Sequence, residues 1–189
     1  MSEHNIEIDL YQCGFYKNLE SFLGYFDQTN DLNKCFVHSS MFDIPSVCEY
    51  FISHGANVNE KDKYGKTALH YAAYKNSKET TKVLLTHDAN VNEKDEDGKT
   101  ALHVAAYNNS KETAEVLLSH GANVNEKDKY GQTALHEAAI YNSKETAEVL
   151  LSHGANVNEK DESIFKQSCS IFFPQWGTKS PPWGAERHP

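Results

Sequence analysis

The sequence predicts an all-α solenoid of stacked helix-turn-helix units joined by short β-hairpin-like turns, and two observations predict it. First, residues 62–94, 95–127 and 128–160 are three successive copies of nearly one 33-residue sequence, and the last two copies agree at 27 of 33 positions. Second, each copy contains two short stretches whose apolar residues recur at helical spacing. A period of this length indicates units that are too small to bury their own apolar faces and that stack on their neighbours.

The first helix of the middle copy is expected to begin after Thr100. Gly98 permits a turn ahead of it, and Thr100 is a good N-cap residue. Leu102, Ala105 and Ala106 then follow at spacings of three and four, which makes a narrow apolar face. Because alanine is small, neighbouring helices can approach closely along this face.

A second helix is expected to begin after Ser110 and to end at Gly121. Asn109 tolerates the left-handed conformation that would end the first helix, and Ser110 is expected to cap the second. Glycine just beyond a helix stops it readily. Residues 122–131 have no helical period and should form the turn to the next copy. The buried stripe is expected to comprise Val116, Leu117 and Leu118.

These signals form a recognisable pattern. Each copy reads Asp-x-x-Gly-x-Thr-Ala-Leu-His-x-Ala-Ala, then Asn-Ser-Lys-Glu-Thr and Val-Leu-Leu, and most copies end in His-Gly-Ala-Asn-Val-Asn. The pattern resembles the ankyrin repeat. The main departure is alanine at positions 68, 101 and 134, where the family usually has proline, and alanine is tolerated at the first helical position.

The resemblance implies a structural role for the histidine that follows each leucine, which is His70, His103 or His136. Such histidines are expected to bond to the nearby threonine and to the adjoining loop, which holds the units in register. A further departure is Asp88, which stands where the next copy has Gly121. We expect Asp88 to be left-handed, at a cost of about 1 kcal/mol.

Residues 1–61 are predicted to be degenerate ankyrin-like repeats that form an N-terminal cap. Residues 53–61 match the ending of the later copies, which makes 29–61 a worn copy with Phe36 in the leucine slot and Ser39–Ser40 in the alanine slots. The apolar side of its second helix is expected to comprise Val47, Tyr50, Phe51 and Ile52.

A weaker match covers residues 3–28, with Leu10 in the leucine slot and Cys13–Gly14 in the alanine slots. Terminal units of solenoids are expected to be atypical, because one face meets water. The aromatic and aliphatic residues of this segment recur at helical spacing at Ile8, Tyr11, Phe15, Leu19, Phe22 and Phe26.

The period fails after Glu162, so residues 161–189 are predicted to be a divergent tail. This tail is expected to be disordered or a truncated repeat. Two interpretations stay open: the tail folds back over the bare face of the last repeat as an improvised cap, or it is unrelated sequence joined to a truncated array, for instance by a frameshift or a misread exon. The absence of a helical period favours the second. An uncapped end would leave Leu135 and Leu150 near solvent.

Composition excludes several classes of function. The chain has 189 residues and a formal net charge of −9, which argues against nucleic acid as the main partner. No run of 18 apolar residues occurs, so no membrane span is expected. The N-terminus lacks the basic and apolar blocks of a signal peptide, so a cytoplasmic location is expected, with the nucleus as the alternative.

Neither a cofactor nor a metal is expected, and we expect no enzymatic activity. No Ser/His/Asp set, glycine-rich phosphate loop or His-Glu-x-x-His string occurs. The repeat explains most histidines, since one of them ends each second helix, at His54, His87, His120 and His153. The cysteines have no Cys-x-x-Cys spacing and are expected to be structural thiols, at Cys13, Cys35, Cys48 and Cys169.

The six differences between the last two copies all fall in the first fourteen residues of each copy. In the family that the chain resembles, the projecting turns and first helices line a concave protein-binding surface, and these positions correspond to it. We name them the varied strip. It comprises Lys63, Tyr64, Lys66, Tyr74, Lys75, Glu96, Asp97, Lys99, Tyr107, Asn108, Lys129, Tyr130, Gln132, Ile140 and Tyr141.

A further varied position is occupied by Tyr71, Val104 and Glu137. These side chains face either a ligand or a neighbouring helix. Tyrosine suits a binding surface, because it brings a large, rigid and amphipathic contact. The alternative is drift at tolerant sites, but exposed second-helix positions such as Lys111 and Lys144 are identical in the last two copies.

The leading functional hypothesis is therefore a non-catalytic scaffold or adaptor that binds another protein. We expect a monomer unless an uncapped last copy self-associates. Two alternatives remain. The first is a truncated or misannotated member of an expanded repeat family that has no function of its own. The second is a self-assembling structural spacer.

Overall fold

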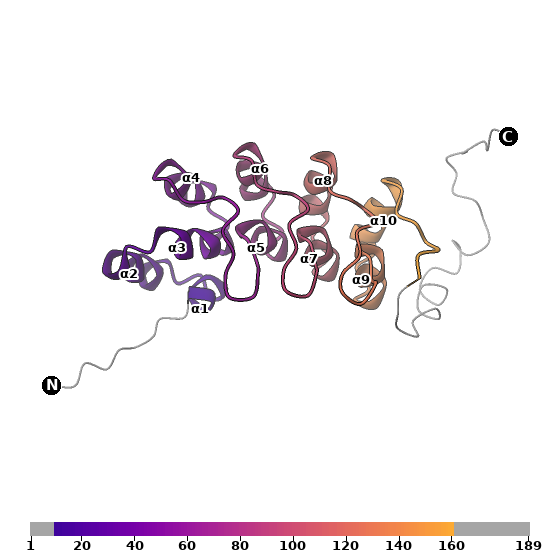
Figure 1. Cartoon of the computed structure of the whole chain (residues 1–189), viewed down its shortest axis with the longest axis horizontal. Helices are drawn as coiled ribbons and strands as arrows, with labels where there is room; N and C mark the ends of the chain where they lie inside the picture. The colour runs from indigo at the N-terminus through magenta and orange to yellow at the C-terminus, as the bar shows by residue number, and fades with distance from the viewer. Residues whose placement is uncertain (1–9, 161–189) are drawn as a thin grey trace.

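The computed structural model describes residues 10–160 and is a row of stacked helix pairs (Figure 1). Within this range the chain is helical and has no strand, so the predicted all-α solenoid is confirmed. The elements are α1 Leu10–Phe15, α2 Leu19–Thr29, α3 Leu32–Ser39, the 3-10 turn η1 Ser40–Phe42, α4 Pro45–Ser53, α5 Ala68–Tyr74, α6 Lys78–Thr86, α7 Ala101–Tyr107, α8 Lys111–Ser119, α9 Ala134–Ile140 and α10 Lys144–Ser152.

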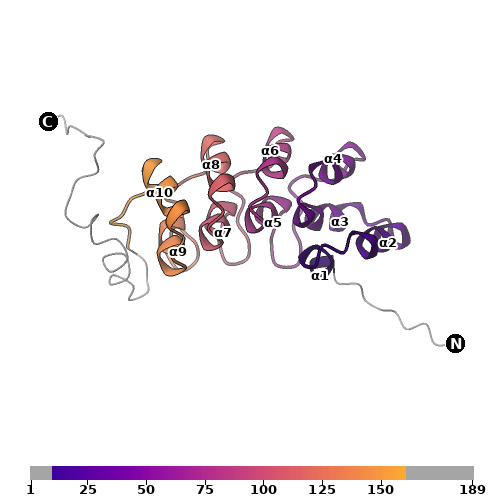
Figure 2. The same ribbon diagram turned by 180° about the vertical axis from the view of Figure 1, so that it is seen from behind.

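The helices form two parallel rows. Helices α3, α5, α7 and α9 pack side by side in the first row, and α4, α6, α8 and α10 form the second (Figures 1 and 2). The turns that precede α5 and α7 extend past the first row (Figure 1). Each copy therefore contacts only its neighbours, as expected for a solenoid.

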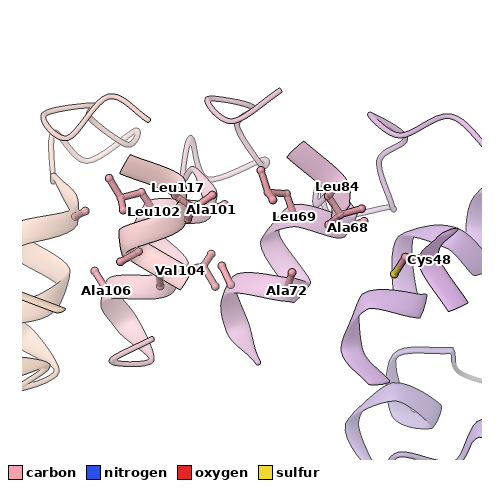
Figure 3. Packing of buried hydrophobic residues seen from close by; sticks show 14 of the residues in the cluster. Cys48, Ala68, Leu69, Ala72, Leu84, Ala101, Leu102, Val104, Ala106 and Leu117 are labelled. Atoms are coloured by element: carbon pink, nitrogen blue, oxygen red, sulfur yellow. The ribbon is translucent and has the colours of Figure 1, made fainter. Parts of the chain in front are cut away.

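The core is a seam of alanine and leucine that runs through both rows. Ala105, Leu117 and Leu150 are fully buried, and Leu102 is 1% exposed. Figure 3 shows Leu69 with Leu84, and Leu102 with Leu117, in the same arrangement in successive copies. Within the predicted stripe of the second helix, Leu118 is only half-buried, because it lies at the margin of the face that packs on α7.

Leu135 and Leu150 in the last copy are buried, with Leu135 7% exposed. In this copy α9 packs on α7, and α10 packs on α8 and α9. Residues 161–189, predicted to be a divergent tail, lie outside the described residues, as do Ile8 and Cys169.

The helix ends confirm the predicted left-handed residues. Asn109 has φ 53° and Gly121 has φ 86°. Asp88, at the position of Gly121, has φ 63° and so adopts a conformation that a side chain disfavours.

Ser110 is the N-cap residue of α8, but the prediction that its side chain caps the helix is wrong. The Thr113 N–H donates instead to Oδ1 of Asn76 in the preceding copy, at 3.1 Å. Asn109 accepts from the Thr146 N–H in the same way, also at 3.1 Å. The residue that ends one copy's first helix therefore caps the second helix of the next copy.

Buried histidines join successive copies, as the resemblance implied. His103 forms a capping box with Thr100, whose backbone N–H donates to Nδ1 at 3.1 Å. Because Nδ1 accepts, the proton must lie on Nε2, which donates to the Gln132 carbonyl 3.1 Å away in the next copy. His70 makes the equivalent bond to the Lys99 carbonyl at 3.0 Å.

Burial lowers the pKa of His70 and of His103 below the ordinary value, although each bonded carbonyl acts in the opposite direction. Each imidazole uses both nitrogens in its neutral form, so protonation would remove the acceptor that holds the threonine N–H. The neutral state of these two side chains is part of the folded structure.

The turns between copies are joined by a repeating set of polar contacts. The Asn90 N–H donates to Asn59 Oδ1 at 2.7 Å, and the Asn123 N–H to Asn92 Oδ1 at 2.8 Å. Lysine-glutamate pairs accompany them, such as Lys61 with Glu93 at 2.6 Å. These pairs are partly exposed and contribute little each, but the asparagine bonds satisfy backbone donors and fix the turn.

The N-terminal region follows the predicted slots in its core and departs from them on its surface. Phe36, Ser39 and Ser40 are buried, as expected for the leucine and alanine slots. Tyr50 is 48% exposed, so its placement on the apolar side of the second helix is wrong. Cys48, which was not placed on that side, is fully buried instead, because it lies on the face of α4 that meets η1 and α6.

Residues 10–29 form α1 and α2, separated by Lys17 with φ 54°. Phe15, the last residue of α1, is not among the buried residues of that helix and is 42% exposed. Leu10, Cys13 and Phe22 are buried. The helical spacing of this segment was predicted, but the side chains that fill the core were only partly identified.

Cys13, Cys35 and Cys48 are buried. Burial raises the pKa of Cys35 to about 12 and that of Cys48 to about 11, so both are protonated and unreactive. Among the described residues, no helix has the length and apolar character needed to span a membrane.

Replacing Asp88 with glycine should stabilise the protein by about 1 kcal/mol, because glycine adopts the left-handed conformation without a side-chain penalty. The matched control is Gly121→Asp, which should destabilise the next copy by a similar amount. Urea denaturation measures both. An unchanged or lower midpoint for Asp88→Gly would contradict the strain at this position.

Stability should fall as the pH is lowered through 6.5, the ordinary histidine pKa. In this range the unfolded chain binds more protons at His70 and His103 than the folded chain does, so each contributes a slope of up to about 1.4 kcal/mol per pH unit. The double variant His70→Gln/His103→Gln should have a flatter profile between about pH 5 and 7. Parallel profiles for the two proteins would refute this account.

Candidate functional site

The varied strip occupies two places in each copy: the turn before the first helix and the end of that helix. Its exposed members are Lys63, Tyr64, Glu96, Asp97, Tyr107, Lys129, Tyr130 and Tyr141. Its half-buried members are Lys66, Tyr74, Lys75, Lys99, Asn108, Gln132 and Ile140. No member is buried, so all of them reach the surface.

An aspartate that is present in all three copies holds each turn. Oδ1 of Asp62 accepts from the backbone N–H groups of Tyr64 at 2.8 Å and Lys66 at 2.9 Å. Asp95 and Asp128 make the same two bonds in their own copies. An aspartate before a glycine turn commonly makes such bonds.

Neighbouring turns are also bonded to each other. The Glu96 N–H donates to the Tyr64 carbonyl at 3.1 Å, and the Lys129 N–H donates to the Asp97 carbonyl at 3.0 Å. Gly65 has φ 72°, and a Cβ there would lie 2.8 Å from the Glu96 nitrogen. The varied side chains of the turns therefore project from a fixed backbone.

Within the turns, the charged and aromatic members of the strip contact one another, both between copies and within a copy. Lys129 bonds to Asp97 of the preceding copy and lowers the pKa of that carboxyl. The Lys63 ammonium lies 5.0 Å from the Tyr64 ring centroid, and that of Lys129 lies 5.2 Å from Tyr130. These contacts are exposed and cost little to rearrange.

At the helix ends, the structure brings Tyr107 and Tyr141 together, with ring centroids 4.1 Å apart and planes tilted by 53°. Lys75 lies 5.6 Å from the Tyr74 ring and 5.0 Å from the ring of Phe15 in α1. Phe15 thus adjoins the strip, and the sequence analysis missed it because the segment was interpreted as a cap.

The alternatives for Tyr71, Val104 and Glu137 are decided by burial. Their exposed fractions are 4%, 9% and 2%, so they pack between first helices and do not line the surface. The Tyr71 hydroxyl donates to Asp62 Oδ2 at 2.5 Å. Glu137 Oε1 accepts from Lys99 Nζ at 2.5 Å, which ties one member of the strip to a buried carboxylate.

The varied strip carries groups suited to non-covalent binding. Aromatic faces, ammonium groups and carboxylates project from a rigid backbone, and these groups suit the binding of another protein. In residues 10–160, no group of three or more His, Cys, Asp or Glu side chains is placed to hold a metal ion.

A comparison with family models finds a match to "Ankyrin repeats (3 copies)" over residues 12–95 and again over residues 87–161. The two matches together cover the repeats and most of the N-terminal region. No curated protein matches the chain.

Substitution of a side chain by alanine should affect stability differently in the varied strip and in the alanine-leucine seam of the core. Leu117→Ala should cost about 2–5 kcal/mol, because it removes a fully buried side chain between copies. Asn108→Ala should change folding stability by less than about 0.5 kcal/mol, since Asn108 is half-buried and bonds only within its own helix end. Similar urea midpoints for the two variants would refute the assignment of Leu117 to the core and of Asn108 to the surface.

Proposed function

The chain belongs to the ankyrin-repeat family, and from that membership we propose that it is a non-catalytic scaffold or adaptor that binds a partner protein through the varied strip. Ankyrin repeats are generally protein-protein interaction modules. The finer proposal concerns which surface of this chain binds, and it rests on where the copies differ.

The observation that carries the proposal is the position of the differences between the last two copies. Five of the six differing pairs lie in the strip, and the sixth is Val104/Glu137. Exposed second-helix residues such as Lys111, Glu112 and Glu115 are identical to their counterparts in the last copy. Drift at tolerant surface sites would have changed those positions too, so exposure alone does not account for the pattern.

The physical character of the strip also supports binding. Tyr64, Tyr107, Tyr130 and Tyr141 are between 44% and 51% exposed. Tyrosine loses little conformational entropy on binding and offers both an apolar ring and a hydroxyl. Because the turns beneath are bonded to each other, little backbone ordering would accompany association.

The remaining parts of the proposal concern organisation. We propose that residues 1–61 cap the array, that 62–94, 95–127 and 128–160 are its repeats, and that 161–189 stand apart from it. We propose a monomer in the cytoplasm or nucleus, and the buried free thiols of Cys35 and Cys48 suit such a reducing compartment.

The proposal is tested by capture from a cell extract, quantified by mass spectrometry. One bait is the native chain, and the second carries alanine at Tyr64, Tyr74, Tyr107, Tyr130 and Tyr141. A third, matched bait carries alanine at the exposed second-helix residues Lys78, Lys111, Glu115, Lys144 and Glu148. Circular dichroism and urea midpoints establish that all three are folded.

We expect a protein that is captured by the native and second-helix baits and lost with the tyrosine variant. Equal capture by all three baits, or loss with both variants, would show that the strip is not the binding surface. If none of the three baits captures a protein, the result would contradict the proposal that the chain is a scaffold.

A further inference from the structure

The turn aspartates of the three copies have different partners for their second carboxylate oxygen. Oδ2 of Asp62 accepts from the Tyr71 hydroxyl at 2.5 Å, and Oδ2 of Asp95 lies 3.8 Å from Lys66 Nζ. Oδ2 of Asp128 is buried and has no hydrogen-bond partner in the part of the chain that the structure describes. The residue is only 7% exposed, so water does not compensate this oxygen freely.

The reason lies in Lys99, which occupies the position of Lys66 one copy later. Lys66 turns to the next aspartate, whereas Lys99 turns to Glu137 and bonds to it at 2.5 Å. Lys66 has no glutamate to bond to in the next copy, because the residue there that is equivalent to Glu137 is Val104. Lys99 therefore bonds to Glu137 and leaves Asp128 Oδ2 without the lysine that Asp95 has.

Both carboxylates act on this lysine. Burial lowers the pKa of Lys99, but the bond to Glu137 and the charges of Glu137 and Asp128 outweigh it and raise the pKa. The Lys99 side chain is 26% exposed and that of Glu137 is 2% exposed, so Lys99 lies on the solvent side of this ion pair. Asp128 Oδ2 is an acceptor to which it can move, in the arrangement that Lys66 and Asp95 already adopt.

We propose that Glu137 receives an arginine side chain of the partner protein, while Lys99 moves from Glu137 to Asp128. This inference rests on the proposed function and specifies the chemistry of the partner. The exchange leaves each carboxylate with a cation, whereas binding of a second cation elsewhere would leave the Asp128 oxygen unpaired. A buried unpaired charge is costly, so the exchange gains an interaction that the free protein lacks.

Arginine fits the site better than lysine. Its planar guanidinium can bond to a carboxylate through two parallel N–H groups and stack on an aromatic ring. Tyr141 lies one helical turn after Glu137, and its ring contacts that of Tyr107. These rings offer the aromatic surface, and the net charge of −9 favours approach of a basic segment.

The test uses N-acetyl-arginine N-methylamide as the probe and the full chain as the receptor. The carboxyl carbon of Asp128 and the ring signals of Tyr141 are followed by NMR during titration. The neutral citrulline analogue, which has the same shape without the charge, is the control ligand. We expect saturable shifts with arginine and none with citrulline.

Three variants separate the site from a general electrostatic effect. Glu137→Val places the residue of the middle copy in the last copy and should weaken arginine binding about tenfold or more. Asp128→Asn keeps Oδ1, which holds the turn, but removes the charge that receives Lys99, and should weaken binding severalfold. Asp95→Asn is the matched control in the preceding copy and should leave arginine affinity unchanged.

Equal shifts with citrulline, unchanged affinity in Glu137→Val, or the absence of saturable shifts would overturn the proposal. An equal loss in Asp95→Asn and Asp128→Asn would overturn the movement of Lys99. Because the probe contains no partner protein, the outcome is independent of the capture experiment. Tyrosine-dependent capture without arginine binding would refute this site alone, whereas arginine binding without such capture would refute the scaffold proposal.

Discussion

The structure depends on contact between successive copies, because no copy can bury its own apolar face. A first helix of seven residues, such as Ala101–Tyr107, is too short to be stable alone. Its alanines bring the neighbouring helix close, and Leu102 and Leu117 fill the space between the rows. Burial of this seam supplies the main favourable term, and every other feature operates on helices that it holds in place.

Apolar packing is non-directional, so polar contacts must fix the register between copies. The buried histidines do so from within, since each links a threonine of its own copy to a carbonyl of the next. The asparagines at 76 and 109 do so at the second-helix ends, where they cap the next copy. A shift of one copy relative to another would leave these groups unpaired, which makes the alignment specific.

A rigid frame gives the varied side chains their significance. The bonded turns and capped helices position Tyr64, Tyr130 and the Tyr107/Tyr141 pair with little freedom in the backbone. The same rigidity makes a buried residue influential at the surface. In the free protein Glu137 is buried beneath Lys99 and bonds to it, so it sets the direction in which this lysine of the strip points.

The sequence by itself determined the repeat length, the helix boundaries, the left-handed residues at 88 and 109 and the structural role of the histidines, because these depend on local spacing and backbone preference. It also located the varied strip, since that required only comparison of the copies. It misplaced Tyr50 and the capping role of Ser110, missed that Phe15 adjoins the strip, and left the position of Tyr71, Val104 and Glu137 open. Only the tertiary structure decided these, because which face of a helix is covered, and which donor lies near a neighbouring copy, depend on how the copies pack in space.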